Sequence, residues 1–180
     1  MKKIFGFLAV FLIFSANCSA KIISDSSGRI TFETSNNWYP DSVGGDEFTI
    51  EVLSIVLDKD TFVTFKKSKN YLSYKSLYVL SDTQKSMIRD NIIQFHLNSL
   101  KNKNYNVYVN KAGIYDNAII VGFTLQQNGI EYKMVTYYSI KNYICYTVSL
   151  GATNYTVIEA LNVMKSLKID GILFTNWVVQ

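Results

Sequence analysis

The sequence has few of the residue types that build metal and catalytic sites. Its 180 residues include one histidine and two cysteines, whereas a structural zinc site usually takes four His or Cys ligands. It contains no glycine-rich phosphate loop, no nucleophile elbow and no Cys-x-x-Cys pair. We therefore expect no metal, no cofactor and no catalytic residues, and a protein that is not an enzyme.

Arginine is also scarce. Arg29 and Arg89 are the only arginines, and arginine is the side chain best suited to phosphate recognition. Lysine and arginine total 18 against 14 acidic residues, a net charge of +4. The basic residues do not gather into the stripe that a nucleic-acid binder shows. We expect no nucleic acid among the partners.

Long apolar runs are missing beyond the start of the chain. The run Ile4–Phe14 is shorter than the roughly 20 residues that a membrane-spanning helix needs. It follows two lysines and precedes small and polar residues, which is the order of a secretory signal. We expect residues 1–20 to be a signal peptide, residues 21–180 to form a single domain, and the mature chain to have no transmembrane helix.

Two processing routes fit the end of this segment. Cys18 and Ala20 are small residues at the positions that signal peptidase I reads, which would start the mature chain at Lys21. The other route is a lipid anchor at Cys18, although Asn17 departs from the usual lipobox. Both routes predict an exported protein, periplasmic or extracellular. After cleavage at Ala20, Cys145 has no disulfide partner, and we interpret it as a small buried apolar residue.

The strand pattern is clearest in the second half of the chain. Asn128-Gly129 is a strong two-residue hairpin signal between two runs of strand-forming residues. A second turn is predicted at Lys141-Asn142. Alternation and β-branched residues predict strands over 30–34, 48–57, 61–67, 106–115, 117–127, 130–140 and 143–150.

Two helices are predicted from apolar residues spaced three or four apart. The long one begins after Ser81, with Gln84 completing a capping box, and runs to about residue 103. The other covers about 155–168, with Thr156 and Glu159 as a second capping box. We interpret residues 171–180 as either a final edge strand or a tail packed on the domain.

Three stretches, ITFETSNNWYP, NGIEYKMVTYYSIKNYICYTVSL and ALNVMKSLKI, resemble the PsbP-like and DcrB-like proteins that bacteria export. The resemblance covers most of residues 29–169. It implies an α+β fold, in which an antiparallel β-sheet meander is flanked by a long central helix and a C-terminal helix as an α/β/α sandwich. It implies no reaction and no site residue, because fold does not fix function.

Five residues are candidates for binding. His96, the single histidine, lies within the apolar stripe of the long helix. It is either a general base or pH sensor, or a core or interface residue with a hydrogen-bonded ring. Asp46 lies in a glycine-containing acidic loop, whose spacing does not match a calcium-binding EF-hand. Alternation places Tyr132 and Tyr138 on one face of the sheet and Tyr137 on the other. Their rings could bind sugars, peptides or a protein, and cross-strand packing explains them at least as well.

These patterns leave open a structural component with no small ligand, and two more specific functional interpretations. The first is a non-enzymatic binding or assembly module of the bacterial envelope that acts through a sheet face or edge on a protein partner. The second is a small-ligand carrier, or an envelope enzyme, with a pocket between the long helix and the sheet. The second interpretation needs His96 to line a cavity that is open to solvent.

Overall fold

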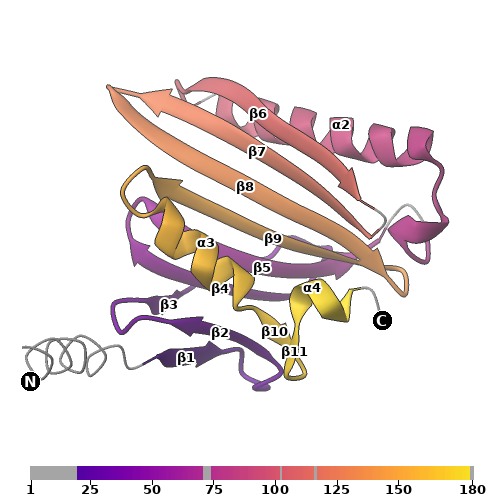
Figure 1. Cartoon of the computed structure of the whole chain (residues 1–180), viewed down its shortest axis with the longest axis horizontal. Helices are drawn as coiled ribbons and strands as arrows, with labels where there is room; N and C mark the ends of the chain where they lie inside the picture. Colours follow the sequence, from indigo (N-terminus) through magenta and orange to yellow (C-terminus); the bar gives the residue numbers. More distant parts are fainter. Residues whose placement is uncertain (1–19, 71–73, 102, 116, 179–180) are drawn as a thin grey trace, which may run out of the picture.

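A seven-stranded antiparallel sheet is the centre of the molecule (Figure 1). The computed structural model describes residues 20–70, 74–101, 103–115 and 117–178. The strand order is β3-β4-β5-β9-β8-β7-β6. The strands are β3 (Tyr39–Asp41), β4 (Thr49–Asp58), β5 (Thr61–Lys69), β6 (Asn106–Tyr115), β7 (Ala118–Gln127), β8 (Ile130–Lys141) and β9 (Ile144–Thr153).

Two tight turns set the register of the meander β7-β8-β9. Asn128 and Gly129 both have positive φ, 52° and 76°, as the predicted hairpin requires. The next turn lies one residue later than predicted. Its central residues are Asn142 and Tyr143, also with positive φ, because Lys141 pairs with Ile144 and leaves only these two residues to form the loop.

A second, four-stranded sheet pairs the two ends of the described chain. It contains β1 (Lys21–Ser24), β2 (Ile30–Thr34), β10 (Lys168–Ile169) and β11 (Ile172–Leu173), in the order β1-β2-β10-β11. Residues 171–178 thus contain both predicted features, because β11 is the edge strand of this small sheet and the residues after it pack on the domain. Their hairpin turns at Asp170-Gly171, and α4 (Phe174–Trp177) follows.

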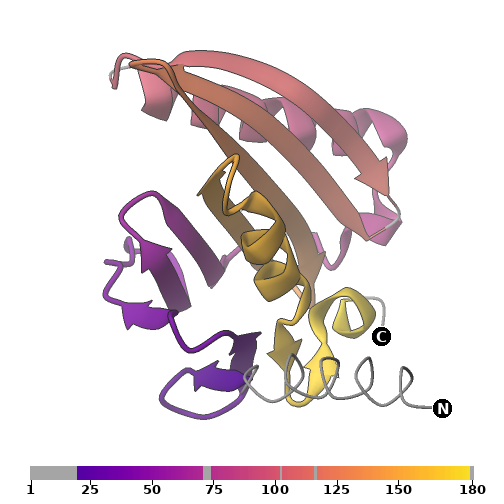
Figure 2. The same ribbon diagram turned by 60° about the vertical axis from the view of Figure 1, so that its left-hand side comes forward.

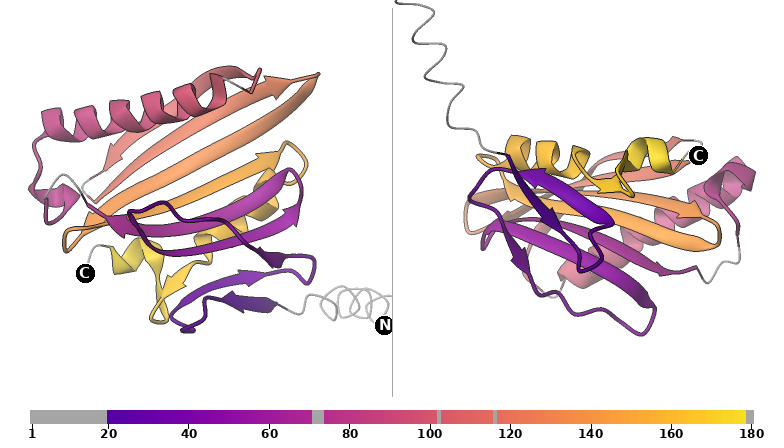
Figure 3. Two further views of the ribbon diagram at one scale, coloured as in Figure 1. Left: turned by 180° about the vertical axis from the view of Figure 1, so that it is seen from behind. Right: turned by 90° about the horizontal axis from the view of Figure 1, so that it is seen from below.

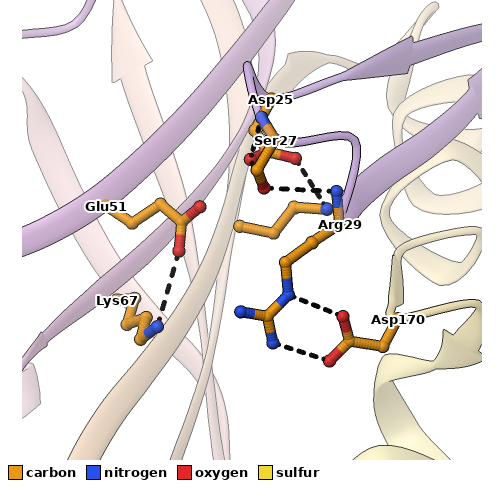
Figure 4. Close-up of polar contacts among 7 residues, drawn as sticks. Asp25, Ser27, Arg29, Glu51, Lys67 and Asp170 are labelled. Carbon is orange, nitrogen blue, oxygen red and sulfur yellow. Dashed lines mark hydrogen bonds and ion pairs between the residues drawn. The ribbon is translucent and has the colours of Figure 1, made fainter.

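Charged side chains join the two hairpins of the small sheet (Figure 4). The Arg29 guanidinium donates two hydrogen bonds to the Asp170 carboxylate, at 2.7 and 2.8 Å. The backbone N–H of Asp170 also donates to the Arg29 carbonyl at 2.8 Å. Asp25 accepts from the backbone N–H groups of Ser27 and Ile30, which closes the turn before β2. The Arg29–Asp170 contacts join residues that are 141 positions apart in the sequence.

The long helix begins as its capping box predicts. It is α2 (Asp82–Lys101), and it follows the short 3-10 helix η1 (Leu77–Val79). The Ser81 backbone N–H donates to Gln84 Oε1 at 2.9 Å, and the Gln84 N–H donates to Ser81 Oγ at 3.3 Å. The backbone N–H groups of Ser81 and Gln84, which have no acceptor within the helix, are satisfied by these two hydrogen bonds.

The second capping box, predicted for α3 (Val157–Lys165), is wrong. Thr156 makes no side-chain cap hydrogen bond, and its hydroxyl bonds to Thr61 at 2.7 Å instead. Glu159 turns away from the helix start and accepts from Trp38 Nε1 at 2.8 Å and Ser35 Oγ at 2.9 Å. Trp38 is fully buried, so its N–H needs this acceptor more than the helix end does.

The large sheet is covered unequally on its two faces. The helix α3, the helix α4 and the small sheet pack on one face over a core that includes Phe32, Trp38 and Phe65. The helix α2 packs on the other face, mainly over β6 and β7. Figure 3 shows α2 along that end of the sheet, with β4 and β5 outside its cover, and Figure 2 shows the twist of the long strands. This is the predicted α+β arrangement.

No helix in the described ranges is long and apolar enough to cross a membrane. The predicted signal peptide, with Asn17 and Cys18, lies outside the described residues apart from Ala20.

Candidate functional site

A groove of about 600 Å³ lies between α2 and the sheet face that the helix leaves partly open. It exists because α2 covers β6 and β7 while the sheet continues through β9 to β5. The helix supplies one wall and the strands supply the floor. The volume is in the range of sites for drug-sized ligands.

The floor of the groove includes three hydroxyls, on Thr64, Ser149 and Thr136. They belong to a row of hydroxyl groups that crosses four adjacent strands. Ser54 on β4 pairs with Thr64 on β5, Thr64 pairs with Ser149 on β9, and Ser149 pairs with Thr136 on β8. Residues that pair directly in an antiparallel sheet point to the same face. The four hydroxyls therefore all face α2, at a spacing of about 4.8 Å from strand to strand.

Hydrogen bonds join this hydroxyl row (Ser54, Thr64, Ser149 and Thr136) into two pairs. Ser54 Oγ and Thr64 Oγ1 are 2.8 Å apart, and Ser149 Oγ and Thr136 Oγ1 are 3.1 Å apart. The outer members, Ser54 and Thr136, are only 3% and 2% exposed. The inner members, Thr64 and Ser149, are half-buried and line the groove. The hydroxyls that a ligand can reach are thus in the middle of the row.

The helical wall of the groove is mostly apolar, with Asn91 and His96 as its polar members. Ile88 and Ile92 are successive members of the stripe that packs on the sheet, and both line the groove. Phe95 also lines it but is 69% exposed. The groove is therefore amphipathic, with aliphatic and aromatic side chains facing a floor of hydroxyls.

His96 lies where the helical wall meets the hydroxyl row. Its Nε2 is 3.2 Å from Thr136 Oγ1, and its ring packs edge-on against Phe123 at 5.3 Å. Burial lowers the pKa of His96, because the charged form would lose water without gaining a counter-ion. In the described ranges, no carboxylate hydrogen-bonds this ring. His96 lines the groove and so meets the condition that the second interpretation sets.

Tyr138 and Cys145 line the other end of the floor. The Tyr138 hydroxyl lies 3.0 Å from the Cys145 sulfur, and burial raises the pKa of both groups. Cys145 is buried, as predicted. It is four residues from Ser149 along β9, roughly 13 Å at the usual rise. The raised pKa keeps the thiol protonated. His96 contacts Thr136, which pairs with Ser149, so Cys145 lies too far from His96 to form a Cys–His dyad.

Asp46 reaches the groove through a lysine. The Lys66 Nζ, on β5, lines the groove and lies 2.6 Å from Asp46 Oδ2. This hydrogen bond, and another that Asp46 accepts from the Thr49 hydroxyl at 2.7 Å, lower the pKa of Asp46 to about 2. No group of three possible metal-ligating side chains occurs among the described residues.

The other two predicted tyrosines lie outside the groove. Tyr132 shares the α2 face with Tyr138, but its ring packs on Tyr105 at 6.1 Å, near the far end of the helix. Tyr137 is on the opposite face, against Phe174 at 5.3 Å. Neither ring presents an exposed aromatic surface. The structure thus brings His96, Tyr138 and, through Lys66, Asp46 to one site.

Sequence reasoning missed the hydroxyl row. The signal within each strand was an alternation that places Ser or Thr where a core-facing strand has Val, Ile or Leu. The stretch TFVTFKK places Thr64 between Val63 and Phe65, so the polar face was visible. The pairing of β5 with β9, which brings Thr64 beside Ser149, could not be predicted from either strand alone.

The chain matches no protein-family model and no curated protein. It is similar in structure to the cyanobacterial PsbP, CyanoP, of Synechocystis sp. PCC 6803, with a TM-score of 0.57 and 14% identity over 84% of this chain and 93% of that one. A crystal structure from Bacteroides thetaiotaomicron VPI-5482 covers 83% of this chain and 48% of its own, with 12% identity and a TM-score of 0.45. The first likeness shows that the fold is PsbP-like, as the three sequence stretches predict.

Proposed function

We propose that this protein is an exported, non-enzymatic binding module that holds a small ligand in the groove between α2 and the sheet. The observation that carries the proposal is the groove itself: an apolar helical wall with Ile92 and Phe95 opposite accessible hydroxyls on Thr64 and Ser149. Ligand sites combine a mostly apolar lining with a few polar groups that orient the ligand. The proposal combines the non-enzymatic binding role of the first interpretation with the pocket between the long helix and the sheet of the second.

The chemistry of the groove favours binding over catalysis. Thr136, the hydroxyl beside His96, is 2% exposed, so a substrate cannot approach it. The accessible Ser149 hydroxyl contacts His96 only through Thr136. A nucleophile needs a base within direct hydrogen-bonding distance, and that base is usually oriented by a third group. This arrangement is suited to holding a ligand and supplies no activated nucleophile.

Export remains part of the proposal. It rests on the order of charged, apolar and small residues in residues 1–20, with cleavage after Ala20 proposed and a lipid anchor at Cys18 as the other outcome. The ligand would then be one that occurs in the cell envelope.

A dye titration with matched variants tests the groove. Nile red, which fluoresces when it leaves water, is titrated into the wild type, Phe95→Ser and Tyr155→Ser. Phe95 and Tyr155 are both exposed aromatic residues, at 69% and 98%, but only Phe95 lines the groove. We expect Phe95→Ser to weaken binding about tenfold, because part of the apolar wall is lost, and Tyr155→Ser to leave it unchanged. Equal affinity in all three proteins would contradict the proposal.

A further inference from the structure

The charge balance of the groove narrows the class of ligand, given the proposed function. Lys66 is the only ionised side chain among the described residues that line the groove, and Asp46 pairs with it at 2.6 Å. The rest of the lining consists of hydroxyl, amide, thiol, imidazole and apolar side chains. A charged ligand would lose its hydration without meeting an unpaired opposite charge, which is costly. The groove therefore favours an uncharged molecule.

The hydroxyl row shows where the polar part of that molecule would lie. A hydroxyl can donate one hydrogen bond and accept two. Thr64 bonds to Ser54, and Ser149 bonds to Thr136, so each inner hydroxyl keeps unused capacity. Thr64 and Ser149 are paired across β5 and β9, and they are the partly exposed members of the row. Their strands lie about 4.8 Å apart, so the polar end of one ligand can hydrogen-bond to both hydroxyls.

We propose that the groove binds an uncharged amphipathic molecule whose polar end bridges Thr64 and Ser149 through carbonyl or hydroxyl oxygens, while its apolar face lies against Ile92 and Phe95. Hydroxyls suit this task because they can serve as donors to a carbonyl or as acceptors from an alcohol. The half-buried position of the two hydroxyls excludes much of the water that would compete for them. The buried outer members of the row, Ser54 and Thr136, orient the Thr64 and Ser149 hydroxyls through their hydrogen bonds.

Two dyes of different charge test this class of ligand. Nile red is an uncharged fused-ring molecule with one carbonyl group, and anilinonaphthalene sulfonate is a ring system of similar kind with a negative charge. We expect the wild type to bind Nile red at least about tenfold more tightly than the sulfonate.

Three conservative variants test the bridge. Thr64→Val and Ser149→Ala each remove one hydrogen-bonding group, so each is expected to weaken Nile red binding by about two- to tenfold. Thr175→Val is the control, because Thr175 is an exposed threonine on α4 and does not line the groove. It is expected to change the affinity less than about twofold. Ser149→Ala leaves Thr136 bonded to His96, so the folded floor is retained.

The outcomes separate this inference from the proposed function. Tighter binding of the sulfonate, lost in Lys66→Met, would make the ligand an anion and overturn the inference while the groove remains the site. Unchanged Nile red affinity in both Thr64→Val and Ser149→Ala would overturn the bridge. If Phe95→Ser also failed to weaken either dye, the groove would not be the binding site and the proposed function would be wrong.

Discussion

At the scale of single residues, His96 makes the stability of the fold depend on pH. Among the described groups with a shifted pKa, it is the only one whose ordinary pKa, about 6.5, lies near neutrality. Burial lowers its pKa, so the unfolded chain binds this proton more readily than the folded chain does. The stability that this group contributes is complete above its ordinary pKa of about 6.5 and is lost as the pH falls through its lower folded-state pKa.

We therefore expect the free energy of unfolding to fall between about pH 7.5 and about pH 5.5, and to fall less in His96→Gln. Urea unfolding followed by circular dichroism measures both. Glutamine cannot take the proton, but it can keep a hydrogen bond to Thr136. The carboxylates with lowered pKa, which include Asp25 and Asp46 at about 2, lose their contribution below about pH 5. An equal fall in both proteins would show that His96 is not the group responsible.

At the scale of elements, the contact between the turn before β3 and α3 fixes how the helix lies on the sheet. Glu159 accepts hydrogen bonds from Trp38 Nε1 and Ser35 Oγ, and the Trp38 ring lies in the core beneath α3. One carboxylate thus satisfies a buried indole N–H and links segments more than a hundred residues apart in the sequence.

Glu159→Ala is expected to lower the free energy of unfolding by about 1–3 kcal/mol, because the Trp38 N–H is left buried without an acceptor. Glu159→Gln is the control, since its amide oxygen can still accept from Trp38, and it should retain most of the stability. Denaturant unfolding followed by Trp fluorescence compares the two. An equal loss in both variants would mean that the negative charge, and not the hydrogen bond, is what matters.

At the scale of the whole molecule, the two faces of the sheet have different roles. One face is closed by α3, α4 and the small sheet over an apolar core. The other is closed only where α2 lies, and its open part carries hydroxyls. Stability and binding are thus assigned to opposite faces, so surface changes in the groove should leave the larger core intact.

Native mass spectrometry of the protein purified from its own cells tests export and ligand binding together. We expect a soluble chain that begins at Lys21 and carries extra mass that is lost on denaturation, because the groove is proposed to hold an envelope ligand. Soluble and membrane fractions are measured side by side. A membrane-bound chain that begins at Cys18 with added acyl mass would replace cleavage after Ala20 with lipid anchoring.

The sequence by itself determined what depends on near neighbours in the chain. Alternation, the Asn128-Gly129 hairpin and the Ser81–Gln84 capping box specify strands, a register and a helix start through contacts a few residues apart. The Asp170-Gly171 turn carried the same kind of signal and could have been predicted. The faces of Tyr137 and Tyr138 also followed from the two-residue repeat of a strand.

Only the tertiary structure decided what depends on distant pairings. The local sequence favoured Glu159 as part of a helix cap, but its carboxylate accepts a hydrogen bond from the buried Trp38 instead. The hydroxyl row arises because β5 lies beside β9 after the chain has passed through α2 and three further strands. Strand registers of such long range are set by the packing of the whole sheet and leave no pattern in either strand alone. For that reason the sequence showed His96 as a candidate but could not show the hydroxyls beside it.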